Sequence, residues 1–119
     1  MVNVLLVEDE LQVAELTRDA LTDAGFSVTV ATDDLAAYRS LEREARSFAA
    51  VVTDINLGSG VTGFDVARRA RLLNHCIKVV YISGQGPHAE QFRVSDAMMV
   101  AKPYNPRDLA DQVVAFLEA

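Results

Sequence analysis

The chain is poor in cysteine and has no long apolar run, and each shortage excludes a class of protein. Cys76 is the single cysteine among 119 residues, so no disulfide can form within the chain. No apolar run approaches the ~18 residues of a membrane span. The run Val4–Val7 is too short for a secretory signal, and acids follow it at once. We therefore expect a cytoplasmic protein with no membrane partner.

Positive charge is also scarce. The chain carries 17 acidic against 11 basic residues, which gives a formal net charge of −6. Binding along a phosphate backbone needs clustered positive charge, so we expect no direct contact with nucleic acid. Half of the residues are hydrophobic, which is enough to form a core. Because this length is typical of one domain, residues 1–119 are predicted to form a single domain.

Apolar runs of strand length alternate along the chain with longer segments of helical period. This alternation is typical of a parallel α/β sheet with helices on both faces. Alternating polar and apolar residues in Phe26–Val30 indicate an edge strand. The strands are predicted at about residues 3–8, 26–30, 49–54, 77–82 and 97–101. The helices are predicted at about residues 13–24, 33–45, 64–73, 88–94 and 106–117.

Individual residues mark several helix ends and faces. Gly25 is placed to end the first helix in the left-handed conformation. Asp33 or its neighbour can cap the second helix, and Asn105 can cap the last one. The helical period places Leu16 and Leu35 on the inward stripes of the first and second helices.

The helix over residues 64–73 carries three arginines, Arg68, Arg69 and Arg71, largely away from its inward stripe. They could contact a partner or a nucleic acid. Because the chain as a whole is acidic, we interpret them as a solvated helix face. His75 and Cys76 lack the further ligands of a metal site and are interpreted as packing residues.

Polar chemistry follows four of the predicted strands, at the point where each strand ends. The carboxyl ends of parallel strands meet at one edge of a sheet, and ligands bind outside that edge. We therefore expect these side chains to lie close together. They are Glu8 and Asp9 after the first strand, Asp54 at the end of the third, Ser83 and Gly84 after the fourth, and Lys102 and Pro103 after the fifth.

Acids crowded at this edge need a cation among them, because close carboxylates repel each other. Mg²⁺ suits such oxygen ligands and often shares a phosphate with them. Lys102 offers a second positive charge, Ser83 a hydroxyl donor, and Gly84 a close approach of the backbone to an anion. Such groups around a carboxylate are what phosphoryl transfer onto Asp54 requires, with Asp54 as the nucleophile.

The ordered set of strand-end residues resembles the receiver domain of bacterial two-component response regulators, of the chemotaxis-regulator type. The resemblance runs over nearly the whole chain and includes Asn56, two places after Asp54. It implies a flavodoxin-like (βα)5 fold, a three-layer sandwich around a parallel five-stranded sheet of strand order 2-1-3-4-5. It also implies a signalling protein rather than an enzyme, with at most Mg²⁺-dependent self-phosphorylation and self-dephosphorylation.

The same resemblance assigns roles to the acidic residues. Asp54 would accept a phosphoryl group from a sensor histidine kinase or a phosphotransfer protein. The domain would then switch conformation to regulate a downstream protein. Mg²⁺ would be held by Asp9, by Asp54 and by the backbone carbonyl of Asn56, with Glu8 acting through water.

The remaining strand-end residues would contact the phosphoryl group. Lys102 would pair with a phosphoryl oxygen, Ser83 would donate a hydrogen bond to it, and the Gly84 backbone would contact it. The peptide bond between Lys102 and Pro103 would be cis. The resemblance also implies a possible homodimer through the helix at 88–94, the strand at 97–101 and the last helix.

Three features depart from the common receiver pattern. Met99 lies three residues before Lys102, at the position where receivers usually carry an aromatic ring. Only 19 positions separate Ser83 from Lys102, which predicts a short or irregular helix between them. The loop after Asp54 lacks the usual proline and instead reads Gly58-Ser59-Gly60.

These departures keep two alternatives open beside the phosphate-accepting switch. The first is a receiver fold that acts mainly as a protein-interaction module, with weak or no switching. The second is a phosphatase of the haloacid-dehalogenase type, which also uses an aspartate nucleophile. That class normally has an acid two places after its nucleophile, where this chain has Asn56.

Overall fold

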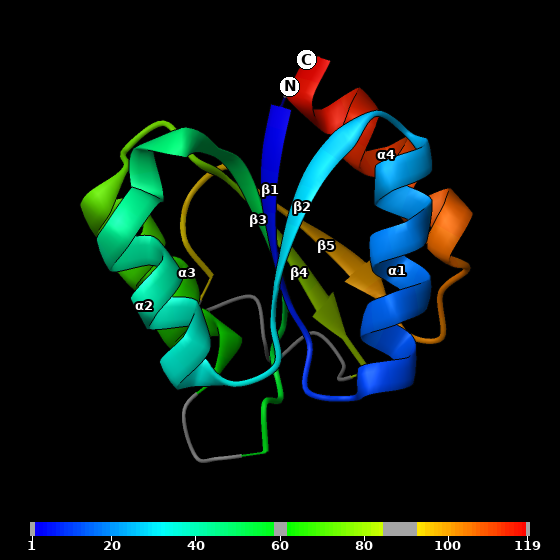
Figure 1. The fold of residues 1–119 in the computed structure, drawn as a ribbon, viewed down its shortest axis with the longest axis horizontal. Helices are drawn as coiled ribbons and strands as arrows, with labels where there is room; N and C mark the ends of the chain where they lie inside the picture. The colour runs from blue at the N-terminus through cyan, green and yellow to red at the C-terminus, as the bar shows by residue number, and fades with distance from the viewer. Residues whose placement is uncertain (1, 59–61, 85–92, 119) are drawn as a thin grey trace.

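The computed structural model describes residues 2–58, 62–84 and 93–118, which form a three-layer α/β sandwich (Figure 1). Five parallel strands make one sheet in the order β2-β1-β3-β4-β5, which confirms the predicted topology. The strands are β1 (Val2–Val7), β2 (Phe26–Ala31), β3 (Phe48–Asp54), β4 (Lys78–Ser83) and β5 (Ala97–Ala101). β2 is an edge strand that pairs with β1, as its alternating sequence predicted.

Helices cover both faces of the sheet. The described helices are α1 (Leu11–Asp23), α2 (Asp34–Glu44), α3 (Gly63–Leu73) and α4 (Pro106–Glu118), with a 3-10 turn η1 (Ala45–Ser47) after α2. α1 and α4 lie on one face of the sheet, and α2 and α3 lie on the other (Figure 1). None of these helices is long and apolar enough to cross a membrane. The helix predicted over 88–94 falls mainly on residues 85–92, which lie outside the described residues.

Strand alternation divides the core into two halves, one on each face of the sheet. Leu5 and Val51 belong to the half that packs under α2 and α3. Leu6 and Val52, their neighbours in sequence, belong to the half under α1 and α4. All four side chains are fully buried. The central strands are therefore apolar on both faces, and polar side chains are confined to their ends.

The helix ends follow the local signals in the sequence. Asp33 caps α2 by accepting a hydrogen bond of 2.7 Å from the backbone N of Ala36. Asn105 accepts a hydrogen bond of 2.8 Å from the backbone N of Arg107 at the start of α4. Gly25 follows α1 with a φ of +104°, a conformation that other residues rarely adopt. These three end signals are confirmed.

The prediction of the inward helix stripes was wrong at two leucines. Leu16 of α1 is 60% exposed and Leu35 of α2 is 59% exposed. Ala14 and Ala37 lie buried against the sheet instead. Small side chains at these positions let the helix backbones approach the strands closely, so the larger leucines lie on the flanks of each buried stripe.

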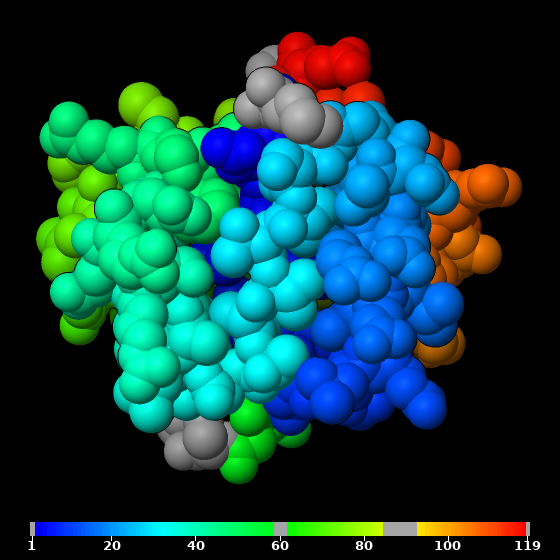
Figure 2. Space-filling view, in the orientation of Figure 1, coloured from blue at the N-terminus to red at the C-terminus, as the bar shows by residue number. Residues whose placement is uncertain are grey.

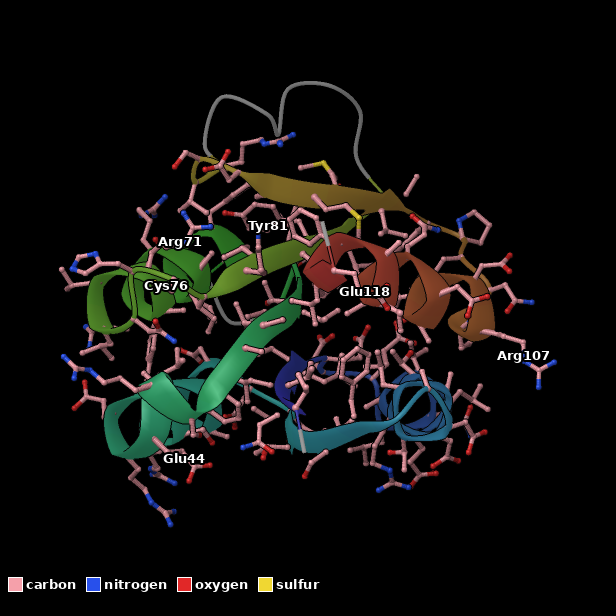
Figure 3. All side chains as sticks on the ribbon, turned by 90° about the horizontal axis from the view of Figure 1, so that it is seen from above. Glu44, Arg71, Cys76, Tyr81, Arg107 and Glu118 are labelled. Carbon is pink, nitrogen blue, oxygen red and sulfur yellow. The ribbon has the colours of Figure 1, made fainter. Side chains whose placement is uncertain are left out.

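The arginines of α3 do not form a uniform solvated face. Arg71 donates hydrogen bonds of 2.9 Å to the carbonyl oxygens of Ile77 and Ser95. It therefore ties α3 to the segments that precede β4 and β5 (Figure 3). Arg68 and Arg69 form ion pairs with acids of α3 and α2, respectively. The interpretation as a solvated face was thus wrong for Arg71.

Candidate functional site

Three carboxylates converge at the carboxyl edge of the sheet. Glu8 follows β1, and Asp54 is the last residue of β3. One oxygen from each of Glu8, Asp9 and Asp54 lies within 4.8 Å of the others. Glu8 is 1% exposed and Asp54 is 3% exposed, whereas Asp9 faces solvent. Two carboxyl groups are therefore held in a place where hydration is largely lost.

Glu8 is a buried acid whose two carboxylate oxygens have different surroundings. Its Oε2 accepts a hydrogen bond of 3.1 Å from the backbone N of Glu10. Its Oε1 is buried and has no hydrogen-bond partner among the described residues. Burial, together with the neighbouring carboxyls of Asp9 and Asp54, raises the pKa of Glu8 to about 7. The site therefore holds a buried acid that the described residues compensate on only one of its two oxygens.

Asp54 is compensated on both of its oxygens. Lys102 donates an ion-paired hydrogen bond from Nζ to Oδ2. The backbone N of Asn56 donates to Oδ1 at 3.0 Å. Desolvation lowers the pKa of Lys102, but the hydrogen bond to Asp54 and the charges of Asp54 and Glu8 outweigh it, and the net direction is upward. Lys102 thus stays charged over the acidic cluster.

The tips of β4 and β5 complete the edge. Ser83 is buried at the end of β4, and its carbonyl accepts a hydrogen bond of 2.8 Å from the backbone N of Lys102. A Cβ placed on Gly84 would lie 3.8 Å from the Lys102 side chain. The bond between Lys102 and Pro103 is cis. The structure therefore brings the strand-end residues predicted from sequence to one edge of the sheet.

The structure also assigns a position to Gly58 beside the acids. Gly58 has a φ of +76°, and a Cβ placed on it would lie 3.3 Å from Oδ2 of Asp9. A side chain here would crowd the carboxylate and would also be strained. Residues 59–61 of this loop, which the sequence comparison with the receiver pattern singled out, lie outside the described residues.

Gly63 is a site residue that sequence reasoning missed. Its backbone N donates a hydrogen bond of 2.7 Å to the carbonyl of Ile55. A Cβ placed on Gly63 would overlap the backbone carbonyl of Asp54. Thr62 and Asp65 form a capping box around it and start α3 at this point. The capping box was a usable sequence signal for the helix start, but not for the close approach to Asp54.

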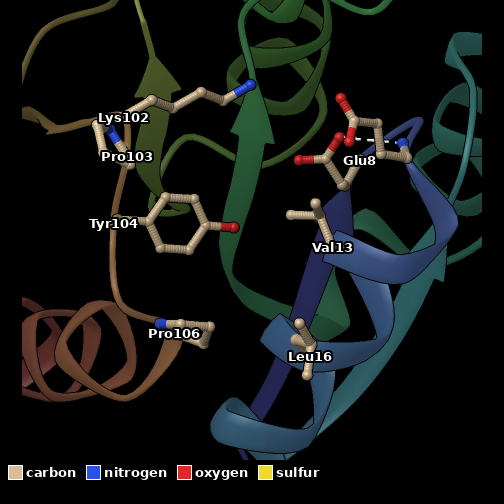
Figure 4. A pocket seen from close by; sticks show the side chains of 8 residues that line it. Glu8, Val13, Leu16, Lys102, Pro103, Tyr104 and Pro106 are labelled. Atoms are coloured by element: carbon tan, nitrogen blue, oxygen red, sulfur yellow. Dashed lines mark hydrogen bonds between the residues drawn. The ribbon is translucent and has the colours of Figure 1, made fainter.

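A hollow of about 530 Å³ opens beside Glu8 and Lys102 (Figure 4). Its apolar lining comes from Val13, Leu16, Pro103, Tyr104 and Pro106. Tyr104, which sequence reasoning also missed, shares a hydrogen bond of 2.7 Å with the hydroxyl of Thr17 on α1. The acidic site is therefore reached along a partly apolar surface between α1 and the start of α4.

The acidic cluster fits a hard divalent cation on its own chemistry. Carboxylate oxygens are the ligands that Mg²⁺ prefers, and three are available within a small space. A cation beside them would relieve the repulsion that raises the pKa of Glu8. The unpartnered Oε1 of Glu8 leaves an acceptor for a metal-bound water. The residues present thus match the cofactor that the resemblance implied.

Comparisons with known proteins show the family to which this chain belongs. The family model described as "Response regulator receiver domain" matches residues 4–114. The response regulator receiver protein CpdR of Brucella abortus is 31% identical over 100% of this chain and 99% of its own length. A response regulator receiver protein from Sinorhizobium medicae superposes with a TM-score of 0.90 at 34% identity, covering 99% of this chain and 95% of that one.

One further solved structure is informative about the fold. The receiver domain of the sensor histidine kinase PA1611 from Pseudomonas aeruginosa superposes with a TM-score of 0.81 at 20% identity. The match covers 98% of each chain. That protein is described with a magnesium ion coordinated in its active-site cleft. At this identity the likeness supports the shared fold alone.

Proposed function

Because the chain belongs to the family of response regulator receiver domains, we propose that Asp54 is the phosphate-accepting residue of a two-component signalling protein. The observation that carries this proposal is the meeting of Glu8, Asp9 and Asp54 with Lys102 at one edge of the sheet. The donor would be a histidine kinase or a phosphotransfer protein. We place the whole chain, residues 1–119, in this one domain.

Asp54 is suited to act as the nucleophile. One of its carboxylate oxygens would attack the phosphorus of a phosphohistidine. The new O–P bond forms as the P–N bond breaks, and the departing imidazole nitrogen takes up a proton. The backbone N of Asn56 holds one oxygen of Asp54, which fixes the direction of the carboxylate before the reaction. Lys102 is already paired with the other oxygen and can follow the added negative charge.

Two residues would hold the product. Ser83 is buried at the tip of β4, where its hydroxyl can donate a hydrogen bond to a phosphoryl oxygen. Gly84 leaves the adjoining backbone accessible, since no Cβ covers it. Phosphorylation would add about −1.5 to −2 charge next to Lys102. The expected response is a new position of Lys102 and Ser83, which is the local event of a switch.

Mg²⁺ would be held by Asp9, Asp54 and the backbone carbonyl of Asn56, with Glu8 acting through a bound water. When bound, the ion supplies positive charge that neutralises the transferring phosphoryl group and the crowded carboxylates. We therefore expect Mg²⁺ to be required for the reaction and to stabilise the fold.

The test is incubation with Mg²⁺ and acetyl phosphate, followed by intact-protein mass spectrometry. Wild type should gain one phosphoryl group, and EDTA should prevent the gain. Asp54→Ala should remove it, whereas Asp23→Ala, at an exposed acid at the end of α1, should not. An unchanged gain in Asp54→Ala, or no gain in wild type with either acetyl phosphate or a histidine kinase, would rule the proposal out.

A receiver fold that binds partners without switching is the second candidate. Met99 favours it, because β5 offers a flexible side chain where receivers usually place an aromatic ring. The amide spectrum with and without beryllofluoride, a phosphoryl mimic, separates the two candidates. Changes confined to the residues around Asp54 would support the non-switching module. Changes that extend along β4 and β5 would support the switch.

A further inference from the structure

The two helical layers carry opposite charge although the chain as a whole is acidic. The layer made of α1 and α4 has six acidic and two basic side chains, a net charge of −4. The layer made of α2, η1 and α3 has four acidic side chains and six arginines, a net charge of +2. The two layers lie on opposite sides of the molecule, as the positions of Glu44 on α2 and Arg107 on α4 show in Figure 3. Over half of the chain's 11 basic residues therefore lie in one layer.

The same layer exposes two leucines. Leu35 on α2 is 59% exposed, and Leu72 on α3 is 71% exposed. Two hollows adjoin at Tyr38, one of about 440 Å³ that includes Leu72 and one of about 320 Å³ that includes Leu35. The outer surface of α2 forms one lobe of the face seen in Figure 2. The layer thus presents two apolar positions on either side of one aromatic ring.

Arginines surround these hollows in two different ways. Arg69 lies 5.1 Å from the centre of the Tyr38 ring and is ion-paired with Glu42 at 2.6 Å, so it is held in place. Arg39 and Arg43 line the smaller hollow. Among the residues that the structure describes, no acid lies within ion-pair distance of either one. These two guanidinium groups therefore remain available to an outside carboxylate.

We propose that this surface, the arginine face (Leu35, Tyr38, Arg39, Arg43, Arg68, Arg69 and Leu72), binds an acidic amphipathic helix of a protein partner. Apolar side chains of that helix would fill the hollows next to Leu35 and Leu72. Its carboxylates would pair with Arg39 and Arg43. The layer that carries this face is positively charged although the chain as a whole is negatively charged. Its charge is therefore complementary to such a helix and would steer the approach of the helix.

The composition of the face favours a protein over a nucleic acid. Glu42, Glu44 and Asp65 are interleaved with the arginines, which would repel a continuous phosphate backbone. Covering exposed leucines with apolar side chains of a partner is favourable, and a phosphate backbone offers no apolar side chains. The hollows of the face and the hollow beside Glu8 and Lys102 are lined by different residues.

The binding can be measured by titrating the full chain with a synthetic peptide and following its amide signals by NMR. The probe is a helical peptide of about 18 residues with leucines at positions i and i+7 and glutamates beside them. We expect the shifts to cluster on α2 and α3. A peptide with lysine in place of glutamate, and one with alanine in place of leucine, should each bind at least about tenfold more weakly.

Charge-matched variants make the test specific. The double variant Arg39→Glu/Arg43→Glu should weaken binding about tenfold or more. Arg18→Glu/Arg107→Glu makes the same change of charge on α1 and α4 and should weaken it less than about twofold. All four positions are exposed, so both variants should fold. Leu72→Ser should weaken binding without changing its dependence on salt.

Several outcomes would overturn the proposal. Equal weakening by the two double variants would mean that net charge alone attracts the peptide. Shifts centred on α1 and α4, or no shifts at all, would place the surface elsewhere or deny it. Tighter binding of a duplex DNA than of the peptide would assign the face to nucleic acid. Shifts that appear when the protein alone is concentrated, and that involve both layers, would assign it to a second copy of the chain.

Discussion

Two regions of the sheet treat their buried polar groups differently. One is the carboxyl end that carries Glu8, Asp9 and Asp54, called the acid end below, and the other is the β5 edge around Tyr81 and Val94. At the acid end, Glu8 and Asp54 are almost fully buried, and one oxygen of Glu8 has no hydrogen-bond partner among residues 2–58, 62–84 and 93–118. At the β5 edge, Tyr81 is also fully buried, but its hydroxyl accepts a hydrogen bond of 3.0 Å from the backbone N of Val94. The acid end therefore keeps a buried acceptor that the described residues leave unpaired, whereas the buried hydroxyl of Tyr81 is paired within the chain.

The β5 edge has an aromatic ring, that of Tyr81, on the strand next to Met99. Tyr81 on β4 and Met99 on β5 are paired in the sheet register. The Tyr81 ring lies 5.1 Å from the ring of Phe64, in the first turn of α3. Met99 packs against the same half of the core. A rigid ring is thus present at this level of the sheet, one strand inward from the position at which receivers usually carry it.

Gly63→Ala should produce the largest effect and would break the acid end. The new Cβ would overlap the backbone carbonyl of Asp54, and both groups belong to backbone that cannot rotate away. We expect a loss of about 3 kcal/mol or more in the free energy of unfolding, measured by urea denaturation. Gly25→Ala is the matched control, because nothing lies within 4 Å of the added Cβ and only the positive φ opposes it. Equal losses in the two variants would contradict the close approach at Asp54.

Glu8→Gln should have the next largest effect and would sharpen the contrast. The ordinary pKa of this carboxyl is 4.5, and burial raises it to about 7 in the folded protein. Between these values the unfolded chain releases its proton while the folded protein keeps it, so stability falls as the pH rises through this window. In EDTA we expect the free energy of unfolding of wild type to fall by on the order of 2 kcal/mol as the pH rises through this window. Glu8→Gln should remove that loss.

The pH series also separates the role of the metal. Glutamine can still accept from the Glu10 backbone N, and its amide can donate to the neighbouring carboxylates, so the variant should fold well. Mg²⁺ should raise the stability of wild type at about pH 8 more than that of the variant. Glu15→Gln, at an exposed position of α1, is the control and should leave the wild-type profile unchanged. Parallel profiles for wild type and Glu8→Gln would show that the buried carboxyl is not strained.

The sequence allowed the acid end to be predicted because its logic is topological. Asp54 ends β3 and Lys102 directly follows β5 in an identifiable α/β alternation, and parallel strands bring such ends together wherever the helices lie. Gly63 and Tyr81 could not be found in this way. Their importance depends on contacts with the Asp54 carbonyl and with the Val94 backbone, which the pattern of strands and helices does not reveal. Leu35 was misplaced because helical period does not determine which side of a wide apolar stripe faces the sheet.

Tyr81→Phe tests the β5 edge. The ring and its packing on Phe64 remain, but the backbone N of Val94 loses its acceptor. An unpaired, partly buried donor of this kind costs about 1–2 kcal/mol. Amide hydrogen exchange at Val94 should accelerate, and urea denaturation should report the loss. Tyr38→Phe removes a hydroxyl from a less buried ring and should cost less than about 0.5 kcal/mol. If the two variants lose the same amount, the edge does not depend on this hydrogen bond.

Tyr104→Phe should have the smallest effect, because the hydroxyl of Tyr104 has a buried partner on one side and an open hollow on the other. It shares its hydrogen bond with Thr17, which is fully buried, yet Tyr104 itself lines the open hollow beside Glu8. Water entering from that hollow can replace the lost hydroxyl, so we expect a loss of only about 0.5 kcal/mol. A double-mutant cycle with Thr17→Val measures the coupling between the two hydroxyls. A coupling as large as the whole effect of Tyr81→Phe would mean that the hollow excludes water, and that this side of the acid end is sealed like the β5 edge.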